Sequence, residues 1–495
     1  MDKKPQNMTT PVKIISGEDY LNSLRGRKLK VYLMGKRVDE PVDHPLLRPS
    51  INAMAKTYDL ALADPDLATV ISPFTGERIN RFLHVAMNAA DVVQQNHMQR
   101  RLGQLTGACF QRCVGMDALN ALYSVTYEID QKHATPYHAR LKHFIQGMQR
   151  GNFVIGGAMT DVKGDRGKSP SAQADPDMYL HVSRRTAEGV YIRGAKAHQT
   201  GCINSHWLIV MPTLRLGPDE ADYAIVGALP VDAGGITYVV GRQSCDTRLL
   251  EGELEAGNAE FSGLEALVIF EDAFIPNDLI FMDGETEFTA LLVERFTAFH
   301  RRSYVCKSGV GDVLIGAAAT VAEYNGVEKA SHIRDKLVEM THLNETIYAT
   351  GIAASYQSLP TPSGAYLCDQ LLANVCKQQV TRITYEMARL AQDLAGGLLV
   401  TLPSEADYQN PLIGPQLEKY LKGRADVPTE HRMRILRLIE NLTLGRNAVS
   451  YLTESLHGAG SPQAQRIQIQ RQMQLEFKGH LAKKLAGIEP DGTRP

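Results

Sequence analysis

Three cysteines and one histidine are the residues whose types best suit metal chemistry, and they occur in two patches of the sequence. Cys109 and Cys113 lie in CFQRC, and His300 and Cys306 lie in HRRSYVCKSGVGDVLIGAA, nearly two hundred residues further along the chain. Thiolate and imidazole ligands suit a structural zinc ion or an iron–sulfur cluster. If the two patches converge in the fold, the chain is a metal-assisted enzyme.

The first pair has the spacing of about one helical turn. Cys109 and Cys113 are four residues apart in an apolar stretch that we expect to be helical, so both thiols would project from one face, about 40° apart. Two thiolates on one face suit two corners of a cluster or a metal site. A core role for both cysteines is the alternative, because free cysteine is a common core residue.

The second pair has a less favourable spacing. In an ideal helix His300 and Cys306, six residues apart, would point about 120° away from each other, whereas Tyr304 and Lys307 would share the face of His300. Joint ligation by His300 and Cys306 therefore requires a bulge or break between them. Without one, Cys306 is a buried thiol beside a face made of His300, Tyr304 and Lys307.

Two polar segments offer groups that could hold a phosphate or a flavin edge. In MTDVKGDRGKSPSAQADPDMYL, glycines and prolines separate five charged residues, namely Asp161, Lys163, Asp165, Arg166 and Lys168. In GAKAHQTGCINSH, a predicted strand ends on three donors and acceptors, which are His198, Gln199 and Thr200. The alternatives are a solvated loop for the first segment and a buried, satisfied network for the second.

Two glutamates occur in apolar surroundings. Glu265 lies in the predicted strand LEALVIF, and Glu454 lies in LTESLHGAGSP. A carboxyl group in apolar surroundings has either a charged partner or a raised pKa. A raised pKa is what a general acid needs. An ion pair, or exposure at an edge, is the alternative for each.

The composition excludes several classes of protein. The chain has 495 residues, 44% hydrophobic residues and a formal net charge of −2, which gives no electrostatic footprint for nucleic acid or an anionic membrane surface. Seven cysteines are too few, and odd in number, for a secreted disulfide framework. The N-terminus lacks an apolar signal core, and no apolar run approaches the length of a membrane helix. We therefore expect a cytoplasmic protein that binds neither nucleic acid nor a membrane.

Three regions of the chain differ in the spacing and the types of their apolar residues. Residues 1–150 carry apolar residues at helical spacing, residues 151–285 are rich in short β-branched and aromatic runs, and helical spacing returns over residues 286–495. Helices segregated from a β middle region predict an α+β fold rather than a doubly wound sheet. No Gly-x-Gly-x-x-Gly motif joins a strand to a helix, so a dinucleotide-binding half is not expected.

Together these patches resemble the 4-hydroxybutyryl-CoA dehydratases, a branch of the wider 4-hydroxyphenylacetate 3-hydroxylase family. The resemblance runs from about residue 85 to residue 475, through GQLTGACFQRCVGMDALNAL, TDVKGDRGKSPSAQADPDMYL, RGAKAHQTGCINSHWLIVMPT, VERFTAFHRRSYVCKSGVGDVLIGAA, LAGGLLVTLPSE and YLTESLHGAGSPQAQ. CFQRCVGMD followed by HRRSY…CK…GVGDV is specific to the dehydratase branch, whereas the hydroxylase branch binds flavin without a cluster.

The resemblance implies an acyl-CoA dehydrogenase-like fold with a helical N-domain, a β-barrel or sheet middle domain and a helical-bundle C-domain, assembled as a homotetramer. It implies FAD and a [4Fe-4S] cluster, with the four cluster ligands at Cys109, Cys113, His300 and Cys306. Flavin contacts would fall on Thr160, Asp161, Arg166, His198, Gln199, Thr200, Ala395, Gly396 and Gly397. Catalytic positions would fall on His300, Glu454, Glu265, Tyr304 and Lys307.

The chain departs from the family pattern at one point. In that pattern the histidine and the last cysteine are seven residues apart, with two glycines between the tyrosine and the cysteine. Here a single Val305 separates Tyr304 from Cys306, so that Cys306 is six residues after His300. The shortened spacing leaves open a full cluster, a variant cluster or none.

The activity implied is the dehydration of 4-hydroxybutyryl-CoA, or a close acyl-CoA, to crotonyl-CoA, with isomerisation of vinylacetyl-CoA as a second reaction. The thioester acidifies the C2 proton but not the C3 proton, and by resemblance one-electron oxidation of the enolate by FAD makes C3 acidic. His300 would be the C2 base, Glu454 and Glu265 would assist proton transfer, and Tyr304 and Lys307 would orient the site. Two alternatives are a two-component FAD-dependent aromatic hydroxylase without a cluster and a catalytically inactive flavin-binding relative.

Overall fold

The computed structural model describes residues 13–242 and 252–488, so Cys245 lies outside the described residues. The first part of the chain is mainly helical. Its helices are α1 (Gly17–Ser23), α2 (Arg48–Ala63), α3 (Pro65–Ala68), α4 (Ala89–Thr106), α5 (Cys113–His133) and α6 (Tyr137–Gly151). Between them lie four short strands, β1 (Val31–Leu33), β2 (Lys36–Val38), β3 (Thr69–Ile71) and β4 (Arg78–Asn80).

The β-rich stretch begins directly after α6. Its strands are β5 (Ile155–Ala158), β6 (His181–Arg185), β7 (Gly189–Thr200), β8 (Trp207–Val210), β9 (Ile225–Pro230), β10 (Ile236–Val240), β11 (Glu265–Pro276) and β12 (Ile280–Asp283). They form a six-stranded sheet, in the order β2-β1-β10-β11-β7-β6, and a four-stranded sheet, in the order β12-β9-β8-β5. The antiparallel register of β11 and β7 pairs Glu265 with Thr200, which brings two predicted site residues together at one end of both strands.

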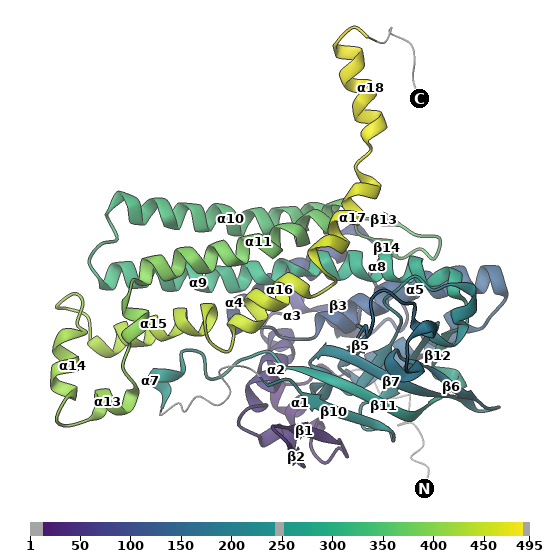
Figure 1. The fold of residues 1–495 in the computed structure, drawn as a ribbon, viewed down its shortest axis with the longest axis horizontal. Helices are drawn as coiled ribbons and strands as arrows, with labels where there is room; N and C mark the ends of the chain where they lie inside the picture. The colour runs from purple at the N-terminus through teal and green to yellow at the C-terminus, as the bar shows by residue number, and fades with distance from the viewer. Residues whose placement is uncertain (1–12, 243–251, 489–495) are drawn as a thin grey trace.

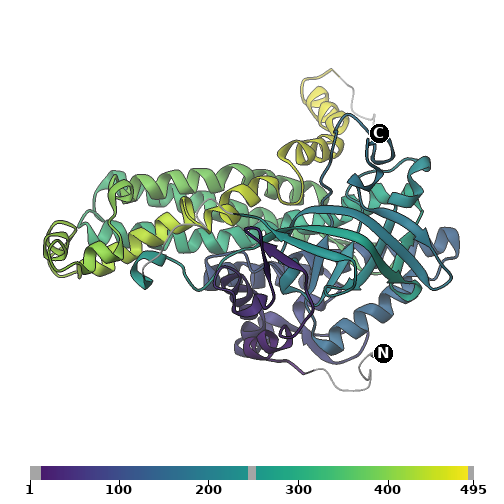
Figure 2. The same ribbon diagram turned by 60° about the horizontal axis from the view of Figure 1, so that its bottom comes forward.

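Helices return after β12. The long ones are α8 (Thr289–Arg302), α9 (Cys306–Tyr324), α10 (Ser331–Tyr356), α11 (Gln370–Ala395) and α15 (Thr429–Thr443). Shorter elements here are β13 (Leu359–Pro360), β14 (Tyr366–Leu367), α12 (Leu398–Thr401), α13 (Glu405–Gln409), α14 (Gly414–Tyr420), α16 (Glu454–His457), α17 (Pro462–Gln472) and α18 (Leu475–Leu485), and one further short helix, α7 (Glu253–Ala256), lies between β10 and β11. Figure 1 shows α9, α10, α11 and α15 side by side as a bundle beside the sheets, and Figures 1 and 2 both show α18 projecting from the body.

The order of helical, β and helical regions confirms the predicted mixed α and β content. The hydrophobic cores do not follow the three regions that the residue patterns of the sequence suggest. The largest core joins residues of α5 and α6 to both sheets and to α8. A second core lies within the C-terminal bundle. In the described ranges the two larger sheets have open strand orders rather than a closed barrel. The division into three domains at residues 150 and 285 stays a prediction.

One helical stretch corrects the expectation about apolar runs. Thr286–Tyr324 is long and apolar enough to cross a membrane by length and composition, because an 18-residue window within it has a mean hydropathy of 1.4. However, 61% of this 18-residue window is buried inside the protein. This stretch contains α8 and α9, whose apolar faces pack in the two main cores, so it is weak evidence for a membrane span.

Candidate functional site

Residues from all three regions of the chain line one cavity of about 350 Å³. The cavity lies where the adjacent ends of β7 and β11 meet the start of α5, the end of α8 and the segment that contains α16. Six predicted catalytic or cluster-binding residues line it together with four predicted flavin contacts, and these ten residues are Cys109, Cys113, Thr160, His198, Gln199, Thr200, Glu265, His300, Tyr304 and Glu454. Residues separated by more than three hundred positions in sequence therefore share one site.

Cys109 reaches the cavity from a loop, so the prediction of one helix through Cys109 and Cys113 is wrong. Gly107 ends α4 in a left-handed conformation, and α5 begins only at Cys113. Between them Gln111 also has a positive φ of 61°, and its side-chain amide donates to the carbonyl oxygens of Ser50 and Cys109 at 3.0 and 3.2 Å. The second bond satisfies the carbonyl oxygen of Cys109, which a continuous helix would have satisfied through its own backbone.

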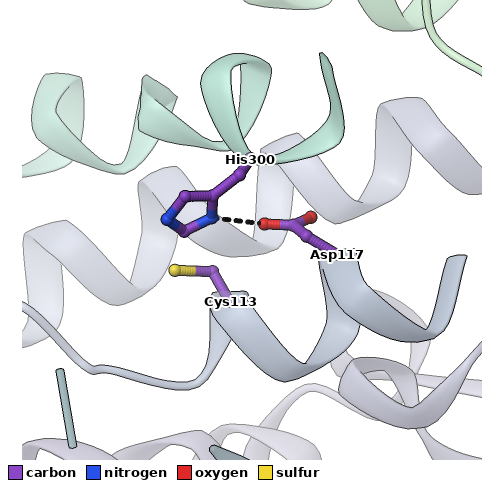
Figure 3. Close-up of side chains that lie close together, drawn as sticks. All are labelled: Cys113, Asp117 and His300. Atoms are coloured by element: carbon purple, nitrogen blue, oxygen red, sulfur yellow. Dashed lines mark hydrogen bonds and ion pairs between the residues drawn. The ribbon is translucent and has the colours of Figure 1, made fainter. Parts of the chain in front are cut away.

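His300 lies beside Cys113 and is hydrogen-bonded to an aspartate on α5. Its Nδ1 is 2.8 Å from Oδ2 of Asp117, and Asp117 is fully buried. One ligand atom from each of Cys113, Asp117 and His300 can be chosen so that all lie within 4.8 Å of one another. Figure 3 shows the Cys113 sulfur on the side of the ring that carries the second nitrogen, Nε2. The sequence interpretation missed Asp117, although its position four residues after Cys113 in CFQRCVGMD places it on the same helix face.

The chain between His300 and Cys306 has the break that joint ligation requires. After α8 ends at Arg302, residues Ser303–Val305 form a 3-10 turn, with ψ of −16° at Ser303 and −18° at Val305. A 3-10 residue turns the chain by about 120° rather than about 100°, so three of them reduce the angle between His300 and Cys306 from about 120° to about 60°. This tightening partly offsets the missing residue.

Cys306 itself is not among the residues that line the cavity. It packs, like Cys113, against the apolar cluster that includes Phe110 and Met116. Burial raises the pKa of the Cys306 thiol to about 11, with the positive charge of Lys307 opposing the rise. Burial, followed by the negative charge of Glu454, raises the pKa of the Cys109 thiol, to which the nearby Cys306 also contributes. The three predicted thiol ligands therefore lie near one another, and a bound metal cation would favour their deprotonation.

Lys307 forms an ion pair with Glu454, which lines the cavity. Its ammonium group is buried, donates to the carbonyl oxygen of Ser450 at 2.7 Å and lies 3.3 Å from Oε2 of Glu454. Burial alone would lower the pKa of Lys307, but the carboxylate of Glu454 raises it above its ordinary value. Glu454 directly follows a π-helical turn, Val449–Thr453, and such turns occur frequently at functional sites.

Glu265 lines the same cavity as Glu454 and has a different environment. Both of its carboxyl oxygens accept from the hydroxyl of Thr200, at 2.7 and 2.9 Å. Burial, and then the negative charge of Glu454, raise the pKa of Glu265 well above its ordinary value, although Thr200 and Lys307 oppose the rise. Two carboxyl groups with different partners suit one proton donor and one charged group in the same site.

Tyr304 is enclosed on two sides. Its hydroxyl is 3.4 Å from the carbonyl oxygen of Glu454, and a Cβ added at Gly458 would lie only 1.6 Å from that hydroxyl oxygen. The buried ammonium group of Lys377 lies 3.7 Å from the centre of the Tyr304 ring and donates to the carbonyl oxygen of Ser455. The sequence interpretation missed Lys377, because nothing local to α11 links it to Tyr304.

The predicted flavin contacts separate into three groups. Thr160, His198 and Gln199 line the cavity with Thr200, and the side chain of Gln199 donates to the carbonyl oxygen of Thr160 at 3.0 Å. Asp161 lies behind them, where its buried carboxylate pairs with Lys196 at 2.6 Å. Arg166 is exposed in the loop that follows.

The predicted glycine motif lies elsewhere. Ala395, Gly396 and Gly397 stand at the end of α11 that is far from the sheets (Figure 1). Gly396 and Gly397 are exposed, and a Cβ added at either would meet nothing within 4 Å. The sequence interpretation also missed His457, which lines the cavity three residues after Glu454, a spacing that places both on one helix face.

The chain is similar to known proteins over almost its whole length. The family model for the N-terminal part of 4-hydroxyphenylacetate 3-hydroxylase matches residues 16–282, and the model for its C-terminal part matches residues 289–487. The chain is 52% identical to a 4-hydroxybutyryl-CoA dehydratase/vinylacetyl-CoA-Δ-isomerase of Clostridium aminobutyricum, over 96% of this chain and all of that protein.

Solved structures show the same fold. An oxygen-tolerant archaeal 4-hydroxybutyryl-CoA dehydratase from N. maritimus superposes with a TM-score of 0.96 and 64% identity, over 98% of this chain and 97% of that one. The FAD complex of the oxygenase component of 4-hydroxyphenylacetate 3-monooxygenase, with 20% identity, superposes with a TM-score of 0.84 over 96% of this chain and all of that one. The chain therefore belongs to the 4-hydroxyphenylacetate 3-hydroxylase family and, within it, to the group of the 4-hydroxybutyryl-CoA dehydratases.

Proposed function

We propose that the protein is a cytoplasmic hydro-lyase that dehydrates 4-hydroxybutyryl-CoA, or a close acyl-CoA, to crotonyl-CoA and isomerises vinylacetyl-CoA. The observation that carries the proposal is the convergence of Cys109, Cys113 and His300 with Glu265 and Glu454 on one cavity. A thiol and imidazole set opposite two carboxyl groups suits a metal-assisted loss of water. The group to which the chain belongs supports the same reaction.

The residues present fit a [4Fe-4S] cluster and FAD. Cys109, Cys113, Cys306 and His300 would hold the cluster, and the gathering of three thiols that form no disulfide beside an imidazole suits such a cluster. Thr160, His198, Gln199 and Thr200 would hold the flavin along the ends of the strands. When bound, FAD would exchange single electrons with the substrate enolate, and an iron without a cysteine ligand would bind the 4-hydroxyl group as a Lewis acid.

His300 would take the C2 proton of the thioester. Its Nδ1 is engaged with Asp117, so both roles predicted for His300, as ligand and as base, fall to Nε2. One nitrogen serves one role at a time, which suits a weakly held histidine ligand that leaves when substrate enters. Because Nε2 lies on the Cys113 side of the ring (Figure 3), either role places substrate next to the thiols.

The two glutamates would divide proton transfer between them. Glu265, whose pKa is raised well above its ordinary value by burial, could donate a proton to the departing hydroxyl group. Glu454, which forms an ion pair with Lys307, could accept the C3 proton. Tyr304 would close the cavity between His300 and Glu454, with its position set by Lys377 and Gly458.

The site as proposed also uses a second copy of the chain. Gly396 and Gly397 lie at the far end of α11 from the cavity, so within one chain they are remote from Thr160 and His198. A homotetramer in which this motif meets the flavin of a neighbouring subunit would bring the two parts together. The substrate of this assembly would be the acyl-CoA thioester. We expect neither nucleic acid nor a membrane as a partner.

The test is iron and acid-labile sulfide per chain in protein purified without air, together with crotonyl-CoA formation from 4-hydroxybutyryl-CoA. We expect about four of each and measurable dehydration. Iron near zero with oxygen-dependent hydroxylation of a phenol by added reduced FAD would overturn the proposal in favour of a hydroxylase. Bound FAD with no response to any acyl-CoA would overturn it in favour of an inactive relative.

A further inference from the structure

We propose that Asp117 is a positioning residue for His300: it holds the imidazole in one orientation and one tautomer, so that Nε2 presents its lone pair to the cavity beside Cys113. The inference rests on the proposed function, because it specifies how His300 is prepared for that role. It adds to the site a buried carboxylate that touches neither the cavity nor the reacting atoms.

The contact between the two side chains is direct and shielded. Nδ1 of His300 and Oδ2 of Asp117 are 2.8 Å apart, and Asp117 is fully buried while His300 keeps part of its surface open to the cavity. In Figure 3 the carboxylate meets the ring edge-on from α5, and the Cys113 thiol approaches from the same helix. A hydrogen bond that water cannot reach restricts rotation of the ring.

The carboxylate is itself held in place. Its second oxygen, Oδ1, accepts from the hydroxyl of Ser303 at 3.0 Å and lies 3.7 Å from the guanidinium group of Arg302. Arg302 is fully buried and donates to the side-chain oxygen of Asn96 at 2.6 Å. Asp117 therefore cannot turn away from His300 without losing partners on its other side.

The chemistry of the pair determines the tautomer. An ionised carboxylate only accepts hydrogen bonds, so a short contact with Nδ1 requires the ring proton to be on that nitrogen. Nε2 then keeps its lone pair, which both a metal ligand and a base require. An asparagine at position 117 could offer its amide N–H instead and favour the opposite tautomer, which would leave Nε2 protonated and unable to serve.

The test compares four forms of the holoenzyme, prepared without air: wild type, Asp117→Asn, His300→Ala and the double variant. The first measurement is the rate at which a chelator removes iron, which needs no substrate. We expect Asp117→Asn to release iron about 10 to 100 times faster than wild type, the range found when a group that orients a ligand is lost. In the His300→Ala background the same substitution should change the rate by less than about twofold.

The second measurement is exchange of the C2 hydrogen of butyryl-CoA into heavy water, which requires the base but not the 4-hydroxyl group. Asp117→Asn should slow this exchange by about 100-fold or more, with little change in KM. Asp91→Asn is the matched control, because it alters another Asp–His pair, the 2.9 Å contact of Asp91 with His84, and neither residue lines the cavity. Its iron release and exchange should stay within about threefold of wild type.

Three results would overturn the inference. The first is that iron release and exchange in Asp117→Asn equal those of wild type. The second is that Asp117→Asn changes both rates as strongly in the His300→Ala background, which would mean that Asp117 acts through Arg302 and the fold. The third is that the control Asp91→Asn matches Asp117→Asn in both measurements. A wild-type protein that holds no iron and forms no crotonyl-CoA would instead refute the proposed function, and the exchange rates alone would then decide the role of Asp117.

Discussion

The ammonium group of Lys307 lies 3.3 Å from Oε2 of Glu454 and joins the first turn of α9 to the segment after the π-helical turn. Both side chains belong to the same region of the chain, but nearly 150 residues separate them. The pKa of Glu265 is raised first by burial and then by the negative charge of Glu454, and Lys307 opposes that rise. This contact therefore sets the difference between the two carboxyl groups of the site.

Replacing Lys307 with Gln should damage both stability and activity. The substitution leaves the Glu454 carboxylate without its positive partner in a buried setting, which costs about 3–5 kcal/mol of unfolding free energy. Dehydration should fall by at least about 100-fold, because Glu454 would lose the buried ammonium group that holds its carboxylate in position. Chemical unfolding and crotonyl-CoA formation measure the two effects. Lys336→Gln, which breaks the more exposed pair with Asp393, is the control and should cost less than about 1 kcal/mol.

Replacing Cys306 with Ser tests whether the 3-10 turn delivers this residue to the cluster. If Cys306 is a ligand, the variant should hold clearly less iron and sulfide than wild type and lose what remains faster to a chelator. Cys376→Ser is the control, because Cys376 is also a buried free cysteine but lies on α11 with its thiol against the carbonyl oxygen of Ile347. Full cluster content in the Cys306 variant would show that another group is the fourth ligand.

Replacing Gly103 with Ala should displace Cys306 from a distance. A Cβ at Gly103 would lie 2.4 Å from the carbonyl oxygen of Cys306, because α4 and α9 cross closely at Gly103 and Gly309. Relieving that overlap costs about 1–3 kcal/mol and moves the start of α9, so iron content should fall as well. Gly316→Ala, also on α9 but with open space around it, should be neutral or stabilising. Unchanged iron in the Gly103 variant would contradict the expected link.

Acid should destabilise the protein through His206. Its Nδ1 accepts from the backbone N–H of Val154 at 2.9 Å, its Nε2 is 2.9 Å from the hydroxyl of Ser23, and burial lowers its pKa to about 3. A histidine kept neutral in the fold but protonated in the unfolded chain contributes stability at neutral pH, which is lost from about pH 6.5 down towards pH 3.

The loss through one such group is at most about 1.4 kcal/mol per pH unit, measured by chemical unfolding at fixed protein concentration. His206→Gln should be less stable at neutral pH but lose stability less steeply with acid than wild type. Ser23→Ala should be slightly less stable and keep the wild-type slope, because His206 stays buried. Equal slopes in wild type and His206→Gln would refute this assignment.

Local patterns in the sequence predicted the α+β fold and several of the candidate site residues. Helical and strand periodicities are repeated over many residues, so the helical, β and helical order was readable without the fold. The same reasoning failed at Cys109, where an apolar stretch with helical spacing is interrupted by Gly107 and Gln111. Of these two left-handed residues, Gln111 is held by a hydrogen bond to the carbonyl oxygen of Ser50, a contact that no periodicity records.

By itself the sequence determined the residue types, the family to which they belong and the one-residue shortening between His300 and Cys306. Only the tertiary structure decided that a 3-10 turn tightens this segment, that Asp117 occupies Nδ1 of His300, and that Glu265 and Glu454 share a cavity. The physical reason is that backbone geometry is encoded by neighbours along the chain. Contacts between α5, α8, β11 and the π-helical turn instead arise from how these elements pack.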